Sequence, residues 1–89
     1  MPERQVTAGP GVGLHARPAA LFVKAASKAA AEVSIAKPGA APVSAKSILA
    51  VLGLDVRGGD EVVLSVEGDG AAETLDELAA MIAAGDGDG

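Results

Sequence analysis

The chain has 89 residues, of which 49% are hydrophobic and 21% charged, a composition typical of a folded globular protein. A net charge of −5 argues against nucleic acid as the main partner. With no cysteine and a single histidine, the chain lacks the means for a disulfide framework, a thiolate metal site or a cysteine nucleophile. No apolar run approaches the ~18–20 residues of a membrane span, and the N-terminus lacks the apolar stretch of a secretory signal. We therefore expect one domain over residues 1–89, in the cytoplasm and not inserted in a membrane, with no metal and no cofactor.

The charges are unevenly distributed along the chain. Residues 1–54 contain six basic and two acidic side chains, whereas residues 55–89 contain one basic and ten acidic side chains. The only histidine, His15, belongs to the basic half. This distribution favours an anionic ligand or an acidic protein partner near His15. An ordinary solvated surface with a chance imbalance is the alternative.

The first third of the chain predicts a strand, a loop and a helix. Val6 and Thr7 favour a strand over residues 4–8, and the Gly- and Pro-rich residues 9–13 predict a loop. A helix is expected from about Ala16 to Ala30, with Pro18 in its first turn, where the missing N–H costs nothing. Apolar residues recur at helical spacing on one side of this helix, namely Ala19, Phe22, Val23, Ala26 and Ala30.

The middle of the chain predicts two strands and a short helix. Residues 32–36 alternate between apolar and polar, as in a half-buried strand. Residues 38–39 predict a turn, and residues 41–43 a short return strand that Pro42 would confine to a sheet edge. Residues 47–52 predict a helix that stops at Gly53.

The last third predicts a turn, a strand and an amphipathic helix. Residues 57–60 contain Gly58-Gly59 and indicate a turn, and residues 61–67 alternate as a strand. Residues 71–84 predict a helix, and residues 85–89 a frayed tail with nothing to bury. The expected inward-facing residues are Val62, Leu64 and Val66 of the strand and Leu75, Leu78, Ala79 and Ile82 of the helix.

The expected element order is β-α-β-β-α-β-α. With so few strands, helices on both faces would leave too little core. An open four-stranded antiparallel sheet with three helices on one face uses the apolar residues most economically, and its other face would be solvated. The predicted fold class is therefore α+β, an open-faced β-sandwich.

The candidate functional site is the segment Gly13-Leu14-His15-Ala16-Arg17-Pro18. His15 lies where the loop meets the helix start, Ala16-Arg17-Pro18, whose unpaired N–H groups attract an anion. A ring nitrogen of His15 can act as a nucleophile toward phosphorus, and the planar guanidinium of Arg17 matches phosphoryl oxygens. Taken alone, this pattern is more typical of a histidine that only caps the helix or is a partly buried polar residue than of a catalytic one.

Residues 11–16 also fit the dinucleotide-binding pattern G-x-G-x-x-G/A, with Glu32 about 20 residues further on. We reject this interpretation because the doubly wound fold needs repeated parallel βαβ units, and 89 residues cannot supply them.

Two motifs resemble the HPr family of phosphocarriers of the bacterial sugar phosphotransferase system. Residues 13–19 resemble its active-site signature, and Ser44-Ala45-Lys46-Ser47-Ile48-Leu49 with Leu52-Gly53-Leu54 resembles its second signature. The similarity extends over roughly residues 5–84, and the expected element order is that of the family.

The resemblance implies a carrier and not a turnover enzyme. Enzyme I, charged by phosphoenolpyruvate, would phosphorylate His15 on Nδ1, Arg17 would steady the phosphoryl group, and IIA domains of sugar permeases would receive it. By pattern alone Ile48 and Leu52 also fit a core, and we expect at least one of them to be buried. The implied partner-binding residues are Ala20, Lys24, Lys28, Ile48, Leu49 and Leu52.

Ser47 matches a serine that a dedicated kinase phosphorylates in some family members. Its simpler role is as the N-cap of the second helix, which we favour. Two alternative functions remain, a carrier of the nitrogen-related branch and a regulatory protein of the same fold that acts by protein binding and Ser47 phosphorylation. Regulatory relatives lack the histidine that is present here. A monomer is expected, because the resemblance implies the oligomeric state that is usual in the family.

Overall fold

The computed structural model describes residues 3–9 and 16–84, and for residues 16–18 the backbone alone. The expected tail, residues 85–89, therefore lies outside the described residues. The order β-α-β-β-α-β-α is confirmed. The elements are β1 (Glu3–Thr7), α1 (Ala16–Lys28), β2 (Glu32–Ala36), β3 (Val43–Ser44), α2 (Ile48–Gly53), β4 (Glu61–Glu67) and α3 (Ala71–Ala84).

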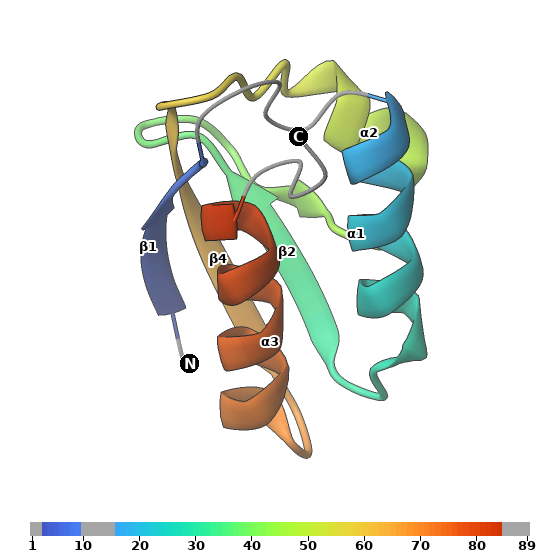
Figure 1. The fold of residues 1–89 in the computed structure, drawn as a ribbon. Helices are drawn as coiled ribbons and strands as arrows, with labels where there is room; N and C mark the ends of the chain where they lie inside the picture. The colour runs from blue at the N-terminus through green and yellow to red at the C-terminus, as the bar shows by residue number, and fades with distance from the viewer. Residues whose placement is uncertain (1–2, 10–15, 85–89) are drawn as a thin grey trace.

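The four strands form one antiparallel sheet in the order β1-β4-β2-β3. The long helices α1 and α3 lie side by side across one face of this sheet, and α2 packs against α1 and β3 (Figure 1). Alternation places Val62, Leu64 and Val66 of β4 in the interior, fully buried. The expected open-faced α+β architecture is thus confirmed, and it has the helical layer that an antiparallel sheet needs on its apolar face.

One hydrophobic core lies between the sheet and the helices. Phe22, the only aromatic residue of the chain, is 1% exposed at its centre. The rest of the core is aliphatic, and each of the three helices contributes to it. Val51 is the one buried residue of α2. The predicted inward residues of α3 are all buried. Nothing polar or charged is buried among the described residues, so this core is held by apolar packing.

The first helix ends at Lys28, two residues earlier than predicted, and Ala30 is exposed. The last turn tightens, since the Ala29 N–H donates to the carbonyl of Ala26, three residues back. The ammonium group of Lys46 donates to the Ala29 carbonyl at 3.0 Å and satisfies it. The periodicity of apolar residues within the helix does not reveal a hydrogen-bond partner so distant in the chain, so the end of α1 was predicted too late.

The return strand is also shorter and later than predicted, Val43–Ser44 instead of residues 41–43. It pairs with β2 through Ile35–Val43 and Ser34–Ser44, and it lies at the sheet edge, as expected. Pro42 has no N–H to give to a ladder and stands outside the strand.

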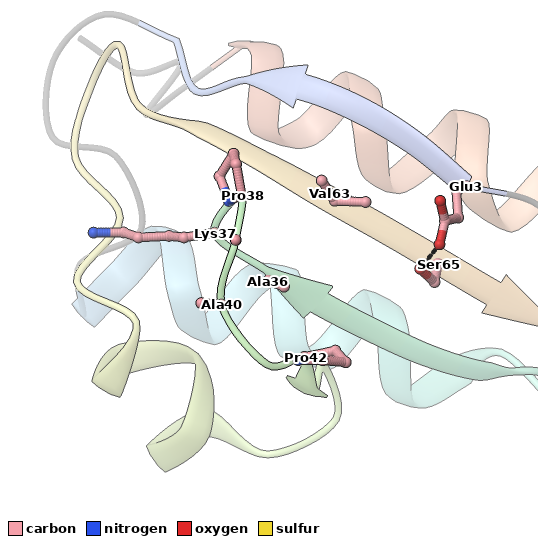
Figure 2. A pocket seen from close by; sticks show the side chains of 9 residues that line it. Glu3, Ala36, Lys37, Pro38, Ala40, Pro42, Val63 and Ser65 are labelled. Atoms are coloured by element: carbon pink, nitrogen blue, oxygen red, sulfur yellow. Dashed lines mark hydrogen bonds between the residues drawn. The ribbon is translucent and has the colours of Figure 1, made fainter.

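The face of the sheet opposite the helices has a shallow depression of about 190 Å³ under the loop that joins β2 to β3 (Figure 2). Apolar and polar residues line it, including Ala36, Val63 and Ser65, and the Ser65 hydroxyl donates to the Glu3 carboxylate at 3.3 Å. This depression is separated from the start of α1 by the sheet, so it does not belong to the candidate site.

Candidate functional site

The site predicted from the sequence is centred on His15, which lies outside the described residues. The structure does describe helix α1, which follows His15 in the chain. Helix α1 begins at Ala16, directly after His15, as expected. A helix start leaves backbone N–H groups without intrahelical partners and carries the positive end of the helix dipole. No acidic residue lies in the first turn of α1 to offset that charge.

Exposed basic residues continue along α1 from this end. The side chain of Arg17 lies outside the described part of the chain, but its backbone belongs to α1. Leu21, Lys24 and Lys28 follow Arg17 by four, seven and eleven residues. Residues at these spacings lie on the same side of a helix. Those three residues are exposed, and so is Ala20. Lys28 lies about 18 Å along the axis from Ala16, at 1.5 Å per residue, so Lys24 is the nearer lysine.

Helix α2 presents apolar side chains to solvent beside α1. Leu49 is 80% exposed, Leu52 37% and Ile48 36%. The expectation that Ile48 or Leu52 belongs to the core is therefore wrong. A helix of only six residues can bury few side chains, and in α2 the buried side chain is that of Val51. We call Ile48, Leu49 and Leu52 the apolar surface of α2.

Leu21 was missed by the sequence analysis. It lies on α1, the helix that packs against α2, and is 53% exposed. The available signal was its position one residue before Phe22 and off the buried stripe of Ala19, Phe22 and Ala26. A leucine that a helix turns away from its core is a candidate for contact with a partner.

Ser47 caps α2, as predicted. Its backbone is extended, with φ −110° and ψ 114°, and its hydroxyl oxygen accepts the Ala50 N–H at 3.3 Å. The exposed hydroxyl thus has a structural role whether or not it is ever modified.

Replacing Ser47 with alanine should lower the free energy of unfolding by about 1 kcal/mol, because an orphan N–H of α2 loses its acceptor. Urea denaturation followed by circular dichroism measures this. Ser27→Ala, at an exposed position within α1, is the matched control and should change stability little. Equal stability of the Ser47 and Ser27 variants would contradict the capping role.

Residues 2–84 match the family described as "PTS HPr component phosphorylation site". The phosphocarrier protein HPr of Streptomyces coelicolor is 49% identical over 85 residues, which are 96% of this chain and 91% of that protein. The chain belongs to the HPr family.

Solved structures agree with this membership. The HPr of Bacillus anthracis superposes with a TM-score of 0.86 at 38% identity, covering 91% of this chain and 95% of that one. The Bacillus subtilis protein Crh, a catabolite repression protein whose crystal structure is an intertwined dimer with a swapped domain, is 40% identical. It superposes with a TM-score of 0.71 and covers 92% of this chain and 93% of its own.

Membership of the HPr family and the antiparallel sheet together exclude the dinucleotide-binding interpretation, since that fold needs a parallel sheet. Within residues 3–9 and 16–84, none of the helices has both the length and the hydropathy to cross a membrane.

Proposed function

We propose that this HPr-family chain carries a phosphoryl group on His15, receiving it from phosphorylated enzyme I and passing it to IIA domains of sugar permeases. It acts as a carrier and not as an enzyme that turns over on its own, and it works in the cytoplasm, where these partners act. The observation that carries the proposal is the family match over residues 2–84, which includes His15 and Arg17. The start of α1 directly after His15 supports it.

The proposed reaction is the transfer of a phosphoryl group to His15 and from it to the next acceptor. The lone pair of Nδ1 of His15 forms a bond to phosphorus while the bond between phosphorus and its donor breaks on the opposite side. Arg17 and the backbone N–H groups at the start of α1 neutralise the phosphoryl oxygens. The same steps in reverse, with a IIA domain as acceptor, release the group. Positioning and charge neutralisation supply the catalysis.

Docking is assigned to the surface formed by α1 and α2. The apolar surface of α2 is exposed and adjoins α1, and Ala20, Lys24 and Lys28 are exposed along α1. An apolar centre with a basic rim suits a partner with an apolar patch surrounded by carboxylates. Lys24, the lysine nearer to His15, should contribute more than Lys28.

The test uses the full chain with enzyme I and phosphoenolpyruvate. Mass spectrometry should show a gain of one phosphoryl group, and subsequent addition of a IIA domain should remove it. A chain that gains nothing from enzyme I of the sugar system, or that keeps its phosphoryl group in the presence of IIA domains, would overturn the proposal. Acceptance only from the enzyme I of the nitrogen-related system would assign the chain to that branch.

A regulatory role like that of a Crh-type protein is the second candidate, favoured by the 40% identity to Crh. In that case a serine kinase would act on the exposed Ser47 and put negative charge at the start of α2. The chain's histidine favours the carrier. We also propose a monomer, and size-exclusion chromatography with light scattering distinguishes it from a dimer of the kind Crh forms.

A further inference from the structure

Ala8 and Gly9, both of which are buried, are the last described residues before the segment that contains His15, which the sequence predicts as a loop. We call these two residues the loop root. Three backbone hydrogen bonds hold it: the Ala8 N–H donates to the Asp60 carbonyl at 2.7 Å, the Gly59 N–H donates to the Ala8 carbonyl at 2.9 Å, and the Gly9 N–H donates to the Ile82 carbonyl at 2.9 Å. Two of the three come from the turn that precedes β4.

This turn, Arg57-Gly58-Gly59-Asp60, is closed twice. The Asp60 N–H donates to the Arg57 carbonyl at 2.9 Å, and the Asp60 carboxylate accepts the Arg57 N–H at 3.0 Å. Gly59 has φ +91°, which a residue with a side chain adopts only with strain. The Asp60 side chain therefore helps to close the turn in which the Gly59 N–H and the Asp60 carbonyl hold Ala8.

Charged side chains brace the turn from outside. The Lys37 ammonium lies 3.6 Å from the Asp60 carboxylate and donates to the Asp55 carbonyl at 3.0 Å. In Figure 2 its side chain extends away from the depression, toward the loop before β4. The Arg57 guanidinium donates to the Asp55 carboxylate at 3.0 Å, and this hydrogen bond, with the charge of Asp55, raises the pKa of Arg57. Asp55 itself has φ +54°.

The turn lies at the functional end of the molecule. The loop from α2 to β4 crosses the end of the sheet at which α1 begins (Figure 1). The loop root is six residues before His15 in the chain, and the turn is its main anchor. A displacement of the turn is thus passed to the loop root, whereas the surface of α1 and α2 used for docking is built on separate elements.

We propose that Asp60 is a positioning residue for phosphoryl transfer, acting through the turn and the loop root on the placement of His15. The inference rests on the proposed function of His15. The proposal predicts different effects on the transfer rate and on docking, which a general loss of stability would not produce. The rate of transfer within the docked complex should fall, because that rate depends steeply on the placement of the reacting atoms, while docking should be unchanged.

The test measures kcat and KM of enzyme I with the full chain as the varied substrate, at a temperature where every variant is folded by circular dichroism. Asp60→Ala should lower kcat about tenfold with KM unchanged. Asp60→Asn keeps an oxygen that accepts the Arg57 N–H and should stay within about twofold of the original chain. Asp69→Ala, an exposed aspartate in the turn at the other end of β4, is the matched control for loss of the charge.

If Asp60→Ala does not fold, Asp60→Glu replaces it, because the added methylene displaces the carboxylate while keeping its charge. The proposal is overturned if Asp60→Ala or Asp60→Glu transfers as fast as Asp69→Ala, if only KM changes, or if Asp60→Asn is as slow as Asp60→Ala. If the unaltered chain accepts no phosphoryl group at all, it is the proposed function that fails.

Discussion

Replacing Phe22 with alanine should lower the free energy of unfolding by about 3–5 kcal/mol, the largest stability loss expected from a single substitution in this chain. Phe22 is 1% exposed and is the only aromatic residue. Its neighbours are aliphatic and already packed against the sheet and other helices, so they cannot expand to fill the cavity. Because small domains are stable by only about 5–15 kcal/mol, the variant should be close to unfolding at room temperature.

The measurement is urea denaturation followed by far-ultraviolet circular dichroism, which needs no aromatic reporter. Leu21→Ala is the matched control, since Leu21 is the preceding residue of the same helix and is 53% exposed. It should cost less than about 1 kcal/mol. Similar losses for the two variants would mean that α1 does not dock through Phe22 as described.

Replacing Leu49 with aspartate should raise the KM of enzyme I for this chain by about tenfold or more, with little change in kcat. Leu49 is 80% exposed, so folding does not depend on it. Burying a leucine side chain in an interface is worth about 1.5–3 kcal/mol, and about 1.4 kcal/mol is a factor of ten in affinity. The added carboxylate also meets a partner that we infer to be acidic, which weakens docking further.

Ala80→Asp adds the same charge at an exposed position of α3, one helical turn after Asp76, which pairs with Arg4 of β1, and should leave KM nearly unchanged. Thermal unfolding of both variants checks that each is folded. The docking assignment would be wrong if Leu49→Asp behaved like Ala80→Asp, or if its defect appeared in kcat alone.

The elements with strong periodicity were predictable from the sequence. Strands β2 and β4 and helix α3 have the bounds expected from alternation and from the 3.6-residue repeat. Ser47 was predictable as a cap because serine before an apolar run is a local signal. The layer arrangement followed from the number of strands, since four strands and three helices allow few ways to bury one core.

Features that depend on partners distant in the chain were not predictable. The end of α1 is set in part by Lys46, 17 residues beyond Ala29. The exposure of Ile48 and Leu52 depends on how α2 sits against α1, which the local pattern does not encode. The brace of Lys37, Asp55 and Asp60 joins a loop after β2 to a turn before β4, and only the folded chain brings them together.

The central claim is that the phosphoryl group is held by His15, and the direct measurement is to map the modification after incubation with enzyme I and phosphoenolpyruvate. One acid-labile phosphoryl group should be found, on the peptide that contains His15, with phosphorus bonded to Nδ1. His15→Ala should remain folded and acquire none. Phosphorylation of that variant, or an acid-stable phosphate on a serine of the unaltered chain, would contradict the account.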